Sequence, residues 1–247
     1  MFHRMLTSAL FAGFAAGLLA ALLHFAFIQK YVLLGETYES GQAVHYAGVD
    51  AAAARTDDHG SRVPDGLDHD HGAATAPVQP GGGALGRNAL TVLFAALVHA
   101  GYGMIMVAGF AVAEHFGHEV RARDGLFWGL AGFVTVQLLP AIGLAPELPG
   151  TLAPDVGLRQ AWWLGTAAAT ATALALIAYG RGRLVHGAAI LLLVSPHLIG
   201  APALDGFIGV APPELAATFA ARALAVGLIG WATLGFLAGR FWSRQGI

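Results

Sequence analysis

The sequence has no cysteine, one lysine (Lys30) and few charged residues of either sign. Without cysteine the chain cannot form disulfides, thiolate metal sites or iron–sulfur clusters, and it has no cysteine nucleophile. No GxxxxGK[ST] motif surrounds Lys30, so a phosphate-binding loop of that kind is excluded. Charged residues are only 11% of the chain and the formal net charge is −2, which excludes the basic surface of a nucleic-acid-binding protein.

Long apolar runs dominate instead. Hydrophobic residues make up 56% of the 247 positions, and the mean hydropathy is +0.64. A water-soluble domain typically carries about 25% charged residues, whereas a helix that crosses a bilayer needs roughly 20 apolar residues in succession. The composition therefore predicts an all-α, polytopic transmembrane helical bundle, with residues 1–247 forming a single integral membrane domain in the lipid bilayer.

Six apolar runs mark the expected spans, at residues 6–28, 89–113, 125–144, 161–178, 184–199 and 215–238. The fifth run is short, so a five-span chain is the alternative. Pro140 and Pro196 are expected to make their helices discontinuous and to expose backbone carbonyls to an ion. Glycines four residues apart would let helices approach closely; these pairs are Gly13/Gly17, Gly125/Gly129 and Gly235/Gly239.

Charge placement favours six spans with both termini in the cytoplasm. Short cytoplasmic connections carry an excess of Lys and Arg, and a chain without the fifth span would put Arg240 and Arg244 outside. Of the 15 acidic residues, the inner side receives only Glu114, Glu119 and Asp124, which we interpret as part of a solvated loop. The remaining acidic residues lie outside and would attract cations. The expected location is the bacterial inner membrane.

The exception to the apolar pattern is residues 40–88, which we expect to form a long, disordered external loop between the first two spans. It is rich in His and Asp, and its candidate metal-capture residues are His45, His59, His69, His71, Asp68 and Asp70. Imidazole and carboxylate groups suit divalent first-row metals such as nickel, cobalt and zinc. The alternative is a solubilising linker whose composition is incidental.

Three histidines lie in the middle or toward the outer end of an expected span: His24, His99 and His197. Ionisable groups inside a membrane are costly and usually face a protein interior or a water-filled path. We therefore predict that they replace part of the hydration shell of a metal ion along a transport path. The alternative for each is a histidine bonded to a neighbouring backbone carbonyl.

Three carboxylates are expected at the outer mouth of such a path. Glu36 and Glu39 follow the first span, and Glu147 sits in a Pro-Glu-Leu-Pro turn that proline stiffens by fixing its φ angle. Arg222 lies inside the sixth span and is expected to orient a carboxylate by pairing with Glu214 or Glu147, or to extend outward to the membrane surface.

Six segments together carry a family resemblance along nearly the whole chain. They are the first span from His24 to Glu36-Thr-Tyr-Glu39, Trp128-Gly-Leu-Ala-Gly-Phe133, Pro146-Glu-Leu-Pro-Gly150, Arg159-Gln-Ala-Trp-Trp163, Pro196-His-Leu-Ile-Gly-Ala-Pro202 and Phe219-Ala-Ala-Arg222. With these segments the chain resembles the CbtA family of predicted cobalt transporter subunits. The resemblance implies cobalt uptake linked to cobalamin synthesis and a small one-span partner subunit, CbtB, with a His-bearing tail. It also implies five spans, whereas the charges favour six.

The sequence thus favours a subunit of an inner-membrane permease that imports cobalt(II), with nickel(II) as a second candidate, and that holds no permanent cofactor. An enzyme is not expected, because no Gly-x-Ser-x-Gly elbow or convincing Ser/His/Asp triad is present. Two alternatives stay open: a membrane metal-binding or scaffold subunit that moves no ion, and a metal exporter.

Overall fold

The computed structural model describes residues 2–45, 83–206 and 209–244. Within these ranges the regular structure is helical, apart from one isolated bridge between Thr151 and Gly209. The elements are α1 (Phe2–Leu23), η1 (His24–Ile28), α2 (Gln29–Glu39), α4 (Ala84–His115), α5 (Asp124–Phe133), η2 (Val134–Leu138), α6 (Leu139–Gly143), α7 (Val156–Tyr179), α8 (Arg183–Ile199) and α9 (Pro213–Arg244). The predicted all-α fold is confirmed.

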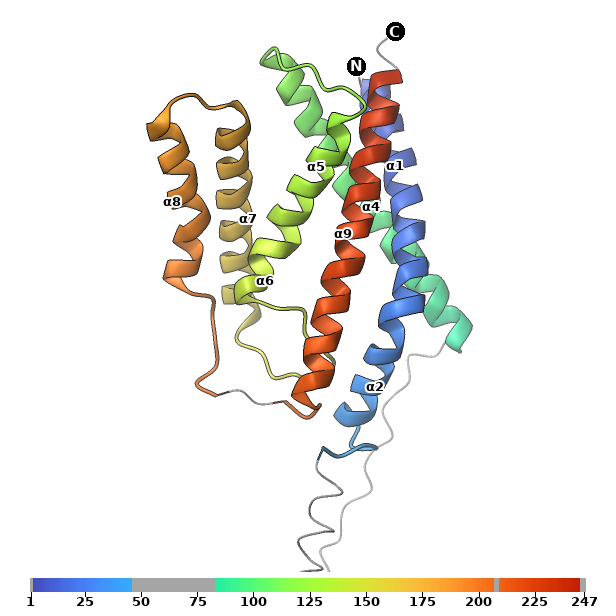
Figure 1. Ribbon diagram of the computed structural model, residues 1–247. Coiled ribbons are helices and arrows are strands. Elements are labelled where there is room, and N and C mark those ends of the chain that lie inside the picture. Colours follow the sequence, from blue (N-terminus) through green and yellow to red (C-terminus); the bar gives the residue numbers. More distant parts are fainter. Residues whose placement is uncertain (1, 46–82, 207–208, 245–247) are drawn as a thin grey trace, which may run out of the picture.

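The helices run up and down as a bundle (Figure 1). Two continuous helical segments, which we call rods, each contain a π-helical turn: η1 joins α1 to α2, and η2 joins α5 to α6. Both described ends of the chain lie at one end of the bundle, and the segments that follow α2, α6 and α8 lie at the other end (Figure 1). We call these the terminal end and the loop end.

Five helices of the described chain are long and apolar enough to cross a membrane: His3–Glu39, Ala84–His115, Asp124–Gly143, Val156–Tyr179 and Pro213–Arg244. This number agrees with the five-span alternative. The segment predicted as a further span forms α8, whose 17 residues extend about 25 Å at 1.5 Å per residue. That length is slightly less than the roughly 30 Å of a bilayer's hydrocarbon core.

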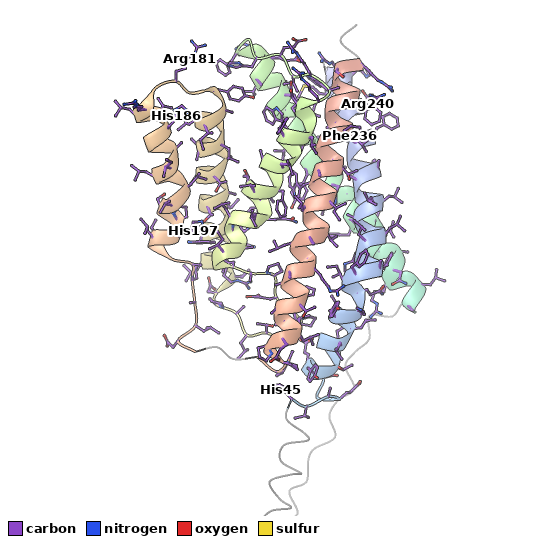
Figure 2. All side chains as sticks on the ribbon, viewed as in Figure 1. His45, Arg181, His186, His197, Phe236 and Arg240 are labelled. Carbon is purple, nitrogen blue, oxygen red and sulfur yellow. The ribbon has the colours of Figure 1, made fainter. Side chains whose placement is uncertain are left out.

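The boundaries around the predicted loop differ from expectation. The first helical rod continues to Glu39, so Glu36 lies on a helix, and α4 begins at Ala84 rather than at residue 89. Five capture candidates lie outside the described residues: His59, His69, His71, Asp68 and Asp70. His45 is described and lies just beyond α2 at the loop end (Figure 2).

Glycine brings the helix backbones together, as the small-residue pairs predicted. On the α1–α4 contact, a Cβ on Gly17 would lie 2.6 Å from Ala96 Cα. On the α5–α9 contact, a Cβ on Gly239 would lie 2.7 Å from Gly125 Cα. Real Cβ atoms do not approach other atoms this closely, so these positions require glycine. The glycine contacts allow van der Waals packing between helices, which is the main attraction available inside a bilayer.

The proline prediction is wrong for Pro196, because α8 continues through it to Ile199. Proline leaves the Leu192 carbonyl without its usual N–H donor, and the hydroxyl of Ser195 donates to that carbonyl instead, at 3.2 Å. Pro140 lies in the first turn of α6, directly after η2, and the rod from α5 to α6 is continuous there.

Candidate functional site

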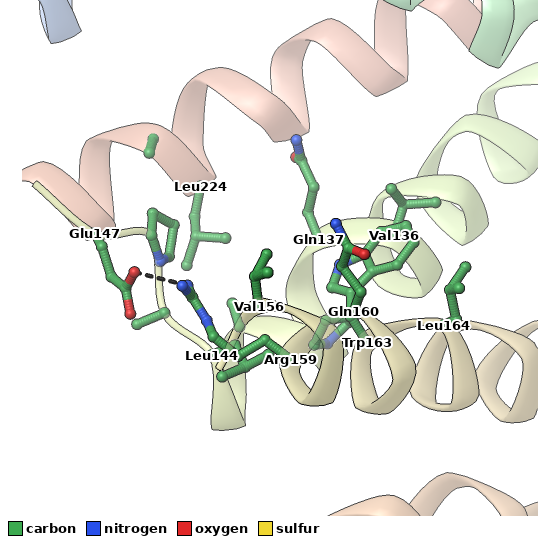
Figure 3. Close-up of a pocket in the computed structure, with 15 residues that line it drawn as sticks. Val136, Gln137, Leu144, Glu147, Val156, Arg159, Gln160, Trp163, Leu164 and Leu224 are labelled. Atoms are coloured by element: carbon green, nitrogen blue, oxygen red, sulfur yellow. Dashed lines mark hydrogen bonds and ion pairs between the residues drawn. The ribbon is translucent and has the colours of Figure 1, made fainter. Parts of the chain in front are cut away.

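A cleft of about 770 Å³ opens at the loop end between η2–α6, α7 and α9. Most of its lining is apolar. Four polar side chains face it, two from the η2–α6 side and two from the first turns of α7 (Figure 3): Gln137, Glu147, Arg159 and Gln160. Concave, mostly apolar sites with a few convergent polar groups are the usual form of a binding pocket.

Glu147 and Arg159 form an ion pair across the mouth of this cleft. Arg159 Nη2 lies 2.7 Å from Glu147 Oε2, and the two side chains are 27% and 31% exposed. Asp155 determines where α7 begins, since its side chain accepts a hydrogen bond from the Leu158 N–H at 3.0 Å. Both side chains are partly exposed, so solvent and ions reach this pair from the mouth of the cleft.

The turn that carries Glu147 is held against α2. Leu148 is buried, and Gly35 of α2 lies so close that a Cβ there would be 3.1 Å from Pro149 Cδ. Gly150 closes the turn with a φ of 78°, and a Cβ on it would lie 3.0 Å from Glu39 Cβ. The turn and the end of α2 therefore form one surface.

Glu36 and Glu39 lie on this surface, on α2. Glu36 Oε2 is 3.6 Å from Arg87 Nη1, and both side chains are about half exposed. The fold thus brings the three predicted mouth carboxylates to the same end of the molecule. They do not converge on one point, because no group of three or more His, Asp or Glu able to hold a metal occurs among the described residues.

Gln137 was missed as a candidate by sequence reasoning, although it is the only amide or charged side chain within the apolar run 125–144. It lies on η2 and points toward α9 (Figure 3). A Cβ on Gly227 of α9 would overlap with Gln137 Oε1. Within the described ranges this buried oxygen has no hydrogen-bond partner. Buried polar atoms are normally bonded, so an unmatched one calls for an explanation.

His99 lies on α4 where α1 and α9 meet it. Its Nδ1 is 2.8 Å from the Ala95 carbonyl oxygen. A carbonyl only accepts, so Nδ1 carries the proton, and the neutral ring presents a lone pair at Nε2. That Nε2 lies 3.2 Å from where a Cβ on Gly230 would be. The bond to Ala95 matches the carbonyl-bonded alternative, and it leaves the second nitrogen available as a ligand.

The other two membrane histidines do not join His99 in a cluster. His197 packs edge-to-face on Trp162 of α7, with ring centroids 6.0 Å apart, and α8 lies on the far side of α7 from α1 (Figures 1 and 2). Its Nε2 is buried without a hydrogen-bond partner in the described structure. His24 opens η1, with its ring 5.8 Å from that of Phe25.

Of the two roles expected for Arg222, pairing with a carboxylate is not found among the described residues. Its guanidinium lies over the ring of Tyr31, 4.9 Å from the centroid, while Glu147 is paired with Arg159. The reason is geometric: η1 and α2 pack against α9 and present an aromatic face to Arg222, and guanidinium groups are attracted to such faces.

In a comparison with known families, residues 2–243 match the model of a family described as probable cobalt transporter subunit (CbtA). The chain belongs to the CbtA family. Comparisons with curated proteins and with solved structures found no match. The CbtA description implies a non-enzymatic role and cobalt as the transported substrate, and the five apolar helices make the chain a multi-pass membrane protein.

The terminal end of this CbtA-family chain differs from the solvated loop that we expected there. The Trp242 Nε1–H donates to Glu114 Oε1 at 2.7 Å, and Arg4 lies 3.8 Å above the Trp242 ring and 3.5 Å from Glu114. Trp242 is fully buried. Glu114 is therefore part of a contact that joins α1, α4 and α9. The sequence shows only that Glu114 follows an apolar run, and this does not predict its partners.

Proposed function

We propose that this chain is the membrane subunit of a permease that imports cobalt(II), with nickel(II) as a second candidate cargo. The family membership supports cobalt as the cargo. The observation that carries the proposal further is the cleft at the loop end, because among the described residues that line it the one carboxylate, Glu147, sits at the mouth in a partly exposed ion pair. The resemblance to the family extends the proposal in two ways: the imported cobalt supplies cobalamin synthesis, and the chain works with a small one-span CbtB-like partner subunit.

In this proposal the loop end faces outward. The terminal end carries Arg181 and Arg240 (Figure 2), together with Arg4, Arg121, Arg123, Arg183 and Arg244. An excess of arginine marks the cytoplasmic side of a membrane. The chain would therefore lie in the bacterial inner membrane with both termini in the cytoplasm. The cleft, Glu36 and Glu39 would then face the compartment from which metal is taken up.

A cation that approaches from outside first meets the carboxylates of α2 and then Glu147. There it replaces Arg159, because a divalent ion is attracted to a carboxylate more strongly than a single guanidinium charge is. His24 and His99 are the candidate ligands along α1 and α4, and His197 is a candidate on the separate α7–α8 contact. The loop candidates beyond His45 would collect metal ahead of this site.

The test is uptake of labelled cobalt by a cobalt-uptake-deficient bacterial host that expresses the full chain, alone and with the CbtB-like subunit. We expect uptake in at least one case, and we expect Glu147→Gln to lower it by about tenfold or more, the scale of losing a group that binds or orients a metal. The matched control is Glu119→Gln, which removes an exposed carboxylate that pairs with Arg121 at the terminal end.

Two results would overturn the proposal. If neither strain takes up cobalt although the protein is present in the membrane, the chain is a metal-binding or scaffold subunit. If expression raises metal resistance and lowers cell-associated cobalt, the chain is an exporter. Equal uptake by the wild type and Glu147→Gln would remove the cleft from the path.

A further inference from the structure

We propose that Gln137 and His99 form a two-ligand cation site against α9, in a notch that Gly227 and Gly230 leave open. The identity of its ion, cobalt(II), rests on the proposed function. The ligand atoms are Gln137 Oε1 from η2 and His99 Nε2 from α4. The site lies deeper in the bundle than Glu147 and uses a residue that the sequence pattern did not single out.

The first argument is the position of the two glycines. Gly227 and Gly230 are three residues apart on α9, and such positions are neighbours on a helix surface, with Cβ positions about 5–6 Å apart. Gln137 Oε1 occupies the space of a Cβ on Gly227, and His99 Nε2 lies 3.2 Å from the Cβ position of Gly230. Two side chains from different helices therefore bring their polar atoms to adjacent points on α9.

The second argument is the chemistry of the two atoms. Gln137 Oε1 is buried and, in the part of the chain that the structure describes, accepts no hydrogen bond. His99 uses Nδ1–H on the Ala95 carbonyl, so Nε2 offers a lone pair. An amide oxygen and an imidazole nitrogen are both electron-pair donors, and imidazole suits first-row divalent metals better than Mg²⁺ or Ca²⁺.

The third argument is the local backbone that presents Gln137. It belongs to η2, a π-helical segment within the third membrane rod, and π-helical turns inside α-helices occur frequently at functional sites. Gln137 also lines the cleft that contains Glu147. One residue thus connects the mouth of the cleft to the contact where His99 lies, which gives an ion successive ligands from the loop end inward.

The experiment measures equilibrium binding of labelled cobalt(II) chloride to the purified full chain in lipid nanodiscs. We expect Gln137→Leu and His99→Ala each to weaken cobalt binding by about tenfold or more. If the two residues hold the same ion, removing the second ligand should cost little once the first is gone. The loss of affinity in the double variant should therefore be much smaller than the product of the two single losses. Gln137→Glu keeps an oxygen ligand and should retain binding.

Two matched controls separate loss of a ligand from loss of structure. Gln29→Leu removes a glutamine that bonds Asn88 elsewhere in the bundle, and it should leave cobalt binding unchanged. Gly230→Ala places a methyl group 3.2 Å from His99 Nε2 and should weaken binding, whereas Gly165→Ala on α7 meets no atom within 4 Å among the described residues and should not.

Three results would each overturn the site. The first is unchanged cobalt binding in Gln137→Leu, and the second is a loss of affinity in the double variant equal to the product of the two single losses. The third is absence of cobalt binding by the wild type. Cellular uptake by the wild type judges the transport proposal separately. A chain that takes up cobalt and binds it equally well after Gln137→Leu would refute this site and leave the transport proposal standing.

Discussion

Single polar side chains hold the ends and the interior of this bundle in place through specific partners. At the terminal end, Glu114 accepts the Trp242 indole N–H, and Arg4 covers the indole ring. At the loop end, Arg159 neutralises Glu147. The same residue type therefore has two roles: Glu114 is fixed by a buried partner, while Glu147 is held by a partner that solvent and ions can reach.

Glu114→Ala should destabilise the protein. It removes the acceptor of a buried indole N–H, and an unsatisfied buried donor costs about 1–3 kcal/mol. The measurement is the thermal unfolding midpoint in detergent. Glu119→Ala, which removes an exposed carboxylate, should leave the midpoint nearly unchanged. Equal midpoints for the wild type and Glu114→Ala would show that the Glu114 contact adds no net stability.

At the scale of whole helices, the positions of the glycines determine which helices can pack closely. α5 and α9 meet through Gly125, Gly129, Gly235 and Gly239, and α1 meets α4 through Gly13, Gly17 and Gly103. These contacts place α9 in the centre, against α1, α4 and α5. The position of α9 matters for function, because it carries the notch at Gly227 and Gly230.

Gly239→Ala should loosen the α5–α9 contact. The added methyl group would lie 2.7 Å from Gly125 Cα, and that backbone atom can move only if the helices separate. Overpacking of this kind costs typically about 1–3 kcal/mol. Thermal unfolding again provides the measurement. Gly165→Ala has open space around it in the described structure, and it should be neutral or stabilising because alanine favours helix more than glycine does.

At the scale of the whole molecule, the direction of each helix sets the number of crossings. α7 and α9 run in the same direction, so the chain returns to the loop end between them along α8 (Figure 1). If both α7 and α9 cross the membrane, α8 must cross it as well, although its 17 residues are few for a span. A short span can thin the bilayer locally, which reconciles six crossings with five long helices.

This topology can be tested because the chain has no native cysteine. Single-cysteine variants Arg181→Cys and Ala203→Cys place a thiol at each end of α8. In spheroplasts, a membrane-impermeant maleimide should label Ala203→Cys from outside, and it should label Arg181→Cys only after permeabilisation. If both positions react alike in intact spheroplasts, α8 does not cross the membrane. The cysteine-free wild type is the labelling control.

Composition and periodicity were sufficient for the coarse fold. A segment that crosses a bilayer must pair its backbone N–H and C=O groups internally, and apolar runs of this length do so as helices. The glycine pairs correctly marked the helix contacts. The five-versus-six question was harder, because α8 has a length near the minimum for a span. The helix boundaries were also inexact, since the ends of α2 and α4 extend beyond the apolar residues that made the spans visible.

The candidate site was predictable only in part. Glu147 was identified from its proline-stiffened turn, and the fold does place it at a cleft. Arg222 was one expected partner of Glu147, but the structure pairs Glu147 with Arg159, because that choice depends on how α7 and α9 are placed around the turn. Gln137 stands out only as a single uncharged amide in an apolar run, which does not say what the side chain meets, and no sequence rule predicts the π-helical segment that turns it toward α9.

The sequence by itself determined that this protein is a helical membrane protein without cysteine chemistry, and its motifs pointed to the CbtA family. Hydrophobicity and residue identity are local properties, so they can be evaluated before any contact is known. Only the tertiary structure decided that His197 lies apart from His99, and that Gln137 meets α9 at Gly227. These relations depend on the packing of helices distant in sequence, and that packing is set by how closely their backbones can approach.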